Sequence, residues 1–142
     1  MRAGEIVIAI RATIGKALPV PPELEGANLT QGTARFAPKA DIDSKYALYL
    51  LRSNAVQNQI DINTKGTTFS EITLADLRRV RVPFVRREGE QLIIAAAVEK
   101  VNISIEEAKK DRAKLKRQKL GLMQDLLTGK VSVEPLLERE PA

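Results

Sequence analysis

The chain has 142 residues, 44% of them hydrophobic and 29% charged, which fits one domain with a buried core and excludes a disordered composition. It contains no cysteine and no histidine, which excludes disulfide frameworks, thiolate catalysis and catalytic sites that need an imidazole base. The formal charge of +5 is compatible with nucleic acid binding but is weak evidence for it. No apolar run approaches the roughly 20 residues of a membrane span, so we expect a cytoplasmic protein with no membrane partner.

The first third of the chain predicts short strands followed by a helix. A run rich in β-branched residues predicts a buried strand at residues 6–10, residues 17–20 are expected to continue it, and alternation predicts a further strand at residues 33–36. Pro19 cannot donate a backbone hydrogen bond, so the second run is expected at an edge of the sheet. Asp43 or Ser44 is a suitable N-cap for a helix over residues 45–60.

The next segment predicts a polar loop, a short helical turn and a further strand. Thr73 followed by Asp76 has the spacing of a capped turn. Residues 79–82 alternate arginine with valine, and Phe84 would lie on the same face of a strand as the two valines. We therefore expect a half-buried strand there, placed at an edge because Pro83 follows.

Residues 90–127 predict one long helix, because they contain no proline and are rich in strong helix formers. Its apolar positions repeat with spacings of four and three, which is the heptad pattern of a helix that pairs with another helix. The seam consists of Ile94, Val98, Val101, Ile105, Ala108, Arg112, Leu115, Lys119, Leu122 and Leu126. The alternative is a helix that lies on its own domain with a broad apolar face.

The charges along this helix predict the direction of pairing. Residues 88–107 carry one basic and five acidic groups, a net charge of −4, whereas residues 108–119 carry seven basic groups and one acidic group, a net charge of +6. Parallel helices would place like charges together, and antiparallel helices place acid beside base. We therefore expect an antiparallel pair, with a second copy or a related chain.

No catalytic arrangement is visible in the sequence. Gly15-Lys16 lacks the other residues of a P-loop, and Asp41 with Asp43 is better interpreted as a helix cap than as a carboxylate pair. We expect neither an enzyme, nor a cofactor, nor a metal site. Polar loops with basic neighbours remain, and they suit phosphates and base edges of duplex DNA, although a solvated surface has the same composition.

Six motifs along the chain resemble, in this order, the DNA-specificity subunit of type I restriction–modification systems. They are GEIVIAIRATIGK at 4–16, LTQG at 29–32, KGTTFSEI at 65–72, VP at 82–83, EQ at 90–91 and KLGLMQDLLTGK at 119–130. The resemblance implies a partial target-recognition domain of mixed α/β character at 1–87, a long coiled-coil helix at 88–129 and a tail at 130–142.

The same resemblance implies partners and site residues. The family's recognition domain reads half of a split duplex DNA site, its long helix pairs antiparallel with a second helix, and the assembly includes methyltransferase and restriction subunits. Catalysis is left to those subunits. The residues that match family loops near DNA are Arg11, Thr13, Lys16, Gln31, Lys65, Thr67, Thr68 and Ser70.

The chain also departs from the family, whose complete specificity subunits carry two recognition domains and two long helices. Here about 85 residues precede a single helix, so we expect a truncated or mis-started gene product, or a reduced half-subunit. An incomplete sheet is expected to expose a strand edge near residues 6–10. The alternative function is a dimerisation remnant that pairs through its helix and binds no DNA.

Overall fold

The structure is a computed structural model that describes residues 1–66 and 70–134. The chain divides into two units, the first of which is Met1–Val98, and the second of which begins at Glu99. None of the described helices combines the length and the apolar character that a bilayer crossing needs.

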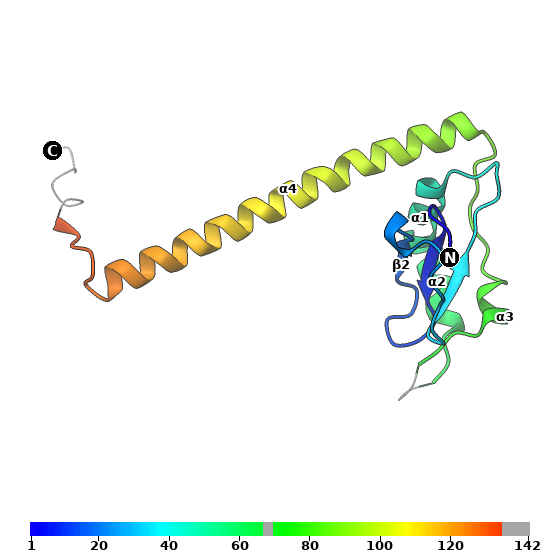
Figure 1. Ribbon diagram of the computed structural model, residues 1–142, viewed down its shortest axis with the longest axis horizontal. Coiled ribbons are helices and arrows are strands. Elements are labelled where there is room, and N and C mark those ends of the chain that lie inside the picture. The colour runs from blue at the N-terminus through cyan, green and yellow to red at the C-terminus, as the bar shows by residue number, and fades with distance from the viewer. Residues whose placement is uncertain (67–69, 135–142) are drawn as a thin grey trace. The chain divides into compact units, whose positions relative to one another are not determined.

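A three-stranded antiparallel sheet forms the centre of the first unit (Figure 1). Its strands are β1 (Ile6–Ala9), β2 (Ala17–Pro19) and β3 (Thr33–Phe36), in the order β2-β1-β3. The strands predicted at 6–10 and 33–36 are confirmed, whereas residues 17–19 form a separate strand that pairs antiparallel with β1 instead of continuing it. β2 lies at an edge, as Pro19 predicts.

The expected exposed edge near residues 6–10 is wrong, because β1 is the central strand. Ile6 lies opposite Pro19 on one side and opposite Phe36 on the other. Both neighbouring strands, β2 and β3, follow β1 in the same chain. They pair with the two sides of β1, so neither of its edges is exposed. The edges of the sheet are β2 and β3 instead.

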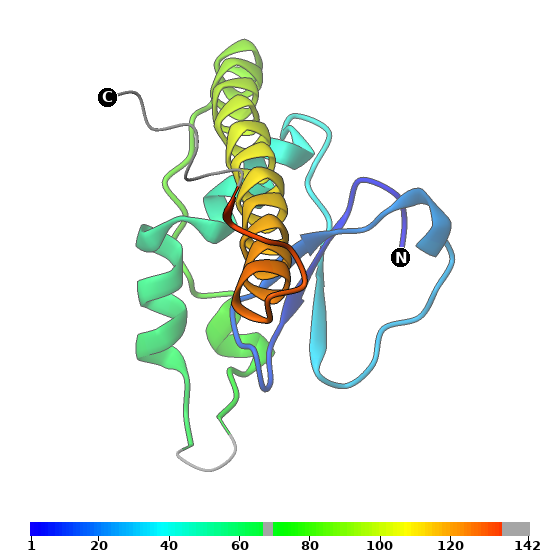
Figure 2. The same cartoon turned by 90° about the vertical axis from the view of Figure 1, so that its left-hand side faces the viewer.

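Helices α1 (Ser44–Arg52) and α2 (Asn54–Asn63) cover one face of the sheet (Figure 2). The predicted N-cap is confirmed at Asp43, whose carboxylate accepts a hydrogen bond from the Tyr46 N–H at 2.7 Å. The single helix predicted over 45–60 is wrong. Ser53 adopts an extended conformation with φ −68° and ψ 148°, and its hydroxyl donates to the Leu50 carbonyl at 2.7 Å, so the helix ends and restarts there.

This packing buries one apolar cluster between the sheet and the two helices. Alternation along β1 turns Ile6 and Ile8 toward the helices and leaves Val7 and Ala9 half-buried on the other face. A 3₁₀ turn at Pro22–Leu24 lies in the connection between β2 and β3. The buried cluster consists of Ile6, Ile8, Ala17, Ala34, Ala47, Leu48, Leu51, Val56, Ile60 and Ile72.

The segment after α3 (Leu74–Leu77) does not join the sheet, so the strand predicted at 79–82 is wrong. The Gln59 side-chain amide accepts from the Arg81 N–H at 2.9 Å and donates to the Arg81 carbonyl at 2.7 Å. The Tyr46 hydroxyl then accepts from the Val85 N–H at 3.0 Å. Side chains of the helices therefore satisfy this extended backbone in place of a neighbouring strand.

Helix α4 (Glu88–Leu127) confirms the predicted long helix. Its 40 residues span about 60 Å at 1.5 Å per residue. The fully buried Gln91 fixes its first turn: Oε1 accepts from the Asp43 N–H at 2.9 Å, and Nε2 donates to the carbonyls of Val85 at 2.9 Å and Asp41 at 3.3 Å. The Gln91 amide thus holds the first turn of α4 against two segments, the one that precedes α1 and the one that leads into α4 itself.

Asp76 organises the turn that carries α3. Thr73 caps this short helix, since its hydroxyl accepts from the Asp76 N–H at 3.1 Å, as predicted. The Asp76 carboxylate in turn accepts from the Thr73 hydroxyl at 2.9 Å and lies 3.2 Å from Lys65 Nζ and 3.6 Å from the Arg79 guanidinium. The hydrogen bond from Thr73, followed by that from Lys65, holds the pKa of Asp76 below its ordinary value.

We expect Gln91→Leu to lower the free energy of unfolding by about 2–3 kcal/mol, because it leaves the Asp43 N–H and the Val85 carbonyl without a partner. Urea unfolding followed by tyrosine fluorescence measures this, since the two tyrosines lie in α1. Gln124→Leu, at an exposed position of the same helix, is the matched control and should change stability by less than about 0.5 kcal/mol. Equal effects of the two substitutions would contradict the role of Gln91.

The lowered pKa of Asp76 predicts a pH-dependent contribution to stability. The folded state favours the carboxylate, so its contribution is complete at neutral pH and is lost as the pH falls through the ordinary aspartate value of about 3.9 toward the lower folded pKa. We expect Asp76→Asn to lower the urea midpoint at neutral pH, and the difference in midpoint from the wild type to shrink as the pH falls below the ordinary aspartate pKa. Asp61→Asn, at an exposed position of α2, is the control. A difference in urea midpoint between Asp76→Asn and the wild type that stays the same at every pH would contradict this account.

Candidate nucleic-acid interface and helical seam

Three loops gather at one end of the sheet, opposite the first turns of α4 (Figures 1 and 2). They are the β1–β2 turn, the segment just before β3, and the loop between α2 and α3. The Ile10 N–H donates to the Gly32 carbonyl at 2.9 Å, and the Ile72 N–H donates to the Ile10 carbonyl at 3.1 Å. Backbone hydrogen bonds therefore hold all three loops beside the end of β1.

The β1–β2 turn has a fixed shape that depends on Gly15. Its φ of +79° favours glycine, and a Cβ built on it would lie 2.5 Å from Gln57 Oε1. The Gln57 amide donates to the Gly15 carbonyl at 3.1 Å and to the Leu51 carbonyl at 2.6 Å. Ala12 also has a positive φ, of 59°. This rigid turn leaves Arg11, Thr13 and Lys16 exposed.

The cations of these loops differ in how they are held. Arg11 Nε lies 2.9 Å from Glu71 Oε2, with both side chains about half-exposed, and Lys65 Nζ lies 3.2 Å from Asp76. Lys16 is exposed and has no carboxylate partner among the residues that the structure describes. Lys16 is therefore the cation of this surface that is available to a phosphate without breaking an ion pair.

The structure brings together six of the eight residues predicted to contact DNA. Arg11, Thr13, Lys16 and Lys65 are exposed at this end of the sheet, and Gln31 is exposed in the loop that Gly32 anchors. The Ser70 hydroxyl donates to the Gly66 carbonyl at 3.1 Å. The remaining two, Thr67 and Thr68, lie outside the described residues. That these side chains contact DNA stays a prediction.

Sequence reasoning missed the groups that shape this surface. Glu71 pairs through its backbone with both Arg11 and Lys65, with mutual N–H to carbonyl hydrogen bonds of 2.9 Å to Lys65. No sequence signal marks Glu71 or Gln57 for these roles, whereas the Thr73-to-Asp76 spacing did mark the capped turn. Within residues 1–66 and 70–134, no three acidic side chains gather in a way that could hold a metal ion.

The second unit carries most of the predicted helical seam. Leu115 and Leu122 are 63% and 60% exposed, and Val101 and Ile105 are also exposed. An apolar hollow on this part of α4 is lined by Leu115, Leu122, Met123, Leu126 and Leu127. Ile94 and Val98, in the first unit, are half-buried. Pairing through this stripe stays a prediction, since the structure holds one chain.

Comparisons with known proteins place this chain in one family. Residues 2–117 match the model described as the type I restriction modification DNA specificity domain. The type I restriction enzyme MjaVIII specificity subunit of Methanocaldococcus jannaschii is 29% identical over 141 residues, which cover 96% of this chain and 33% of that protein. The chain thus spans about a third of the length of this relative.

Solved structures show the same fold. The HsdS subunit from Thermoanaerobacter tengcongensis has a TM-score of 0.67 and 25% identity over 87% of this chain and 32% of its own. A chain from a study of complex assembly and conformational transition in the type I R-M system has a TM-score of 0.77 and 23% identity, over 94% of this chain and 35% of its own. The mixed α/β domain followed by one long helix is common to these chains, and the family match covers most of the sequence, so the protein belongs to the type I restriction–modification DNA specificity domain family.

Proposed function

We propose that this chain is a DNA-recognition module, which reads one half of a split duplex site and docks a methyltransferase without catalysing a reaction itself. The observation that carries the proposal is the gathering of three polar loops at one end of the sheet, where Lys16 is exposed and has no carboxylate partner in the described part of the chain. Such a module acts on genomic DNA in the cytoplasm, within an assembly that also includes the restriction subunit.

The loop surface suits a duplex because its backbone is rigid while its cationic tips are exposed. Gln57 fixes the β1–β2 turn, and Glu71 joins that turn to the loop after α2. Preorganised loops lose little conformational entropy on binding. Arg11 can exchange the Glu71 carboxylate for a phosphate, since both side chains are half-exposed. Phosphate contacts of this kind position a protein on DNA, and polar side chains such as Gln31 then reach base edges.

The open stripe on α4 supports antiparallel pairing with a second helix of the same kind. Apolar side chains as exposed as Leu115 and Leu122 favour burial against a partner. The acidic first half and the basic second half of the helix complement each other only when the two chains run in opposite directions. Pairing of this kind joins two recognition domains through about 60 Å of helix.

The same stripe also favours a second candidate function, a protein-interaction module that dimerises and binds no DNA. Two of the predicted DNA-contacting cations, Arg11 and Lys65, are already held by carboxylates of the chain itself. Duplex binding separates the two candidates, because only the recognition module responds to changes at Lys16.

Lys16→Gln should weaken duplex binding and make the slope of log affinity against log salt shallower by about one, the loss of one phosphate contact. Fluorescence anisotropy with a labelled duplex of mixed sequence, together with a type I methyltransferase subunit, between about 50 and 200 mM salt, measures this slope. Lys39→Gln is the matched control, because Lys39 is exposed in the connection between β3 and α1, away from the loops. Absence of duplex binding at low salt, or an equal loss of affinity in Lys39→Gln, would contradict the proposed DNA-recognition function.

Leu122→Lys should prevent pairing, because it places a charge in the apolar seam. Sedimentation equilibrium is expected to show a dimer for the wild type and for Leu120→Lys, and a monomer for Leu122→Lys. Leu120 is the matched control, since it is 56% exposed but lies off the seam. A monomeric wild type at all accessible concentrations would remove the basis of the pairing proposal.

The direction of pairing can be measured separately, because the natural chain contains no cysteine. Spin labels on Leu92→Cys in both chains should lie far apart, and one label at Leu92→Cys should lie close to a label at Gln124→Cys in the partner. Thirty-two residues of helix separate these positions by about 48 Å. Short distances between the two Leu92→Cys labels would show parallel helices and contradict the proposal.

A further inference from the structure

The two edges of the sheet differ in what they leave open. On β2, Pro19 has no N–H, and the Ala17 carbonyl accepts hydrogen bonds from Arg52 Nε at 3.0 Å and from its terminal nitrogen at 2.8 Å. An added strand would need a free N–H at Pro19 and a free carbonyl at Ala17, and this edge offers neither. The β2 edge is therefore closed.

The β3 edge is open at Arg35. The register places Ile8 opposite Ala34, and the Ile10 N–H donates to the Gly32 carbonyl at 2.9 Å. Because hydrogen-bonded pairs alternate along an antiparallel ladder, Thr33 and Arg35 turn their backbone groups away from β1. The Thr33 N–H is used by the Thr30 carbonyl at 3.3 Å, whereas no partner is found for the Arg35 N–H and carbonyl among the described residues.

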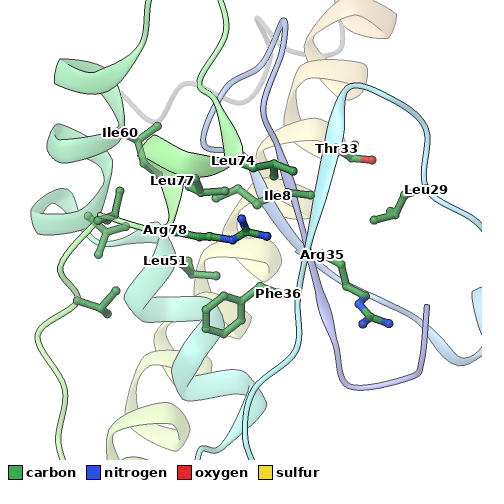
Figure 3. Close-up of a pocket in the computed structure, with 14 residues that line it drawn as sticks. Ile8, Leu29, Thr33, Arg35, Phe36, Leu51, Ile60, Leu74, Leu77 and Arg78 are labelled. Carbon is green, nitrogen blue, oxygen red and sulfur yellow. The ribbon is translucent and has the colours of Figure 1, made fainter.

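A cavity of about 540 Å³ runs along this open edge (Figure 3). On the side of the core it is lined by Phe36, Leu51 and Leu77, and around the outer side of β3 by Leu29 and Thr33. A strand alternates its side chains between two faces. A strand laid against β3 would therefore find apolar contacts for both of its faces.

The charge of the cavity restricts what can occupy it. Arg35 and Arg78 are among its 14 lining residues, and none of the lining residues is acidic. The Arg78 side chain is exposed, and its guanidinium points toward β3 in Figure 3. Arg35 lies 3.6 Å from Glu5 Oε1, so Arg78 is the lining cation without a carboxylate partner among the described residues. A second copy of β3 (Thr33–Phe36) would bring no acidic side chain to Arg78. DNA would meet the cations but would leave the apolar lining and the strand edge unused.

We propose that the β3 edge and its cavity bind an extended segment of a second polypeptide, with alternating apolar side chains and at least one acidic side chain. The Arg35 N–H and carbonyl pair with the backbone of the segment, its apolar side chains fill the cavity, and its carboxylate meets Arg78. This is strand addition to an open sheet edge, in which the backbone supplies affinity and the cavity supplies selectivity. The site shares Leu29 with the loop before β3, but it does not use the exposed cations of the polar loops and does not depend on DNA binding.

The test uses the full chain and labelled peptides of about six residues, a typical strand length. One peptide alternates valine with aspartate and threonine, a second has the same composition with the valines contiguous, and a third alternates but carries lysine in place of aspartate. Fluorescence anisotropy should show that the first binds at least about tenfold more tightly than either of the others. Equal binding of the first two peptides would overturn the proposal.

Two substitutions test the two halves of the site. Arg35→Pro removes the outward N–H at an edge position where proline is tolerated, together with the ion pair to Glu5. It should weaken binding of the first peptide by about tenfold with the circular dichroism unchanged. Arg78→Glu should reverse the preference, so that the lysine peptide binds better than the aspartate peptide. Arg86→Glu, outside the cavity, is the charge-matched control and should leave the preference as it is.

Other occupants would appear as distinct results, each of which overturns the proposal. Displacement of the peptide by a mixed-sequence duplex would assign the edge to DNA. Protection of the Arg35 amide that rises with protein concentration, in the absence of peptide, would assign it to a second copy of β3. If the Arg78→Glu protein still prefers the aspartate peptide to the lysine peptide, Arg78 is not the partner of the peptide carboxylate.

Discussion

The buried amide of Gln91 is the interaction on which the first unit most depends. It is fully enclosed, and it makes three hydrogen bonds to backbone groups of segments more than 40 residues apart in sequence. A buried amide has few alternative partners, so its orientation fixes where the chain before α1 and the first turn of α4 lie. The Glu90-Gln91 pair that resembles the family is thus a joint between a domain and a helix.

Gln57 and Gln59 act in the same way elsewhere in the unit. A sheet of three short strands has few ladder positions, and long connections leave backbone groups in need of partners. Gln57 satisfies the carbonyl of the β1–β2 turn, and Gln59 pairs with both backbone groups of Arg81. Side-chain amides therefore extend the hydrogen-bonded framework beyond the sheet and bring the functional loops to fixed positions.

Local features of the fold could be predicted from the sequence, and long-range ones could not. The β-branched runs, the caps at Asp43 and Thr73 and the helix over Glu88–Leu127 are set by neighbouring residues, and the structure contains them. The lost strand at 79–82 depends on the distant side chain of Gln59, for which alternation carries no signal. The break at Ser53 rests on the bond from its hydroxyl to the Leu50 carbonyl, and the helical pattern runs through it unchanged.

The candidate site shows the same division. Basic residues in polar loops can be found from composition and spacing, and the loops do meet at one end of the sheet. That Glu71 holds Arg11 and that Asp76 holds Lys65 follows only from the fold, because 60 and 11 residues separate these pairs. The sequence therefore predicts which cations are present, and the fold decides which of them is unpaired.

The guanidinium of Arg52 makes growth of the sheet one-sided. Because it occupies the β2 edge, a further strand can add only at β3, where Arg35 turns its backbone groups away from β1. A chain with a single open edge cannot join two neighbours through its sheet, which a growing fibre would require. Closing one edge thus limits the size of any aggregate while leaving the other edge available.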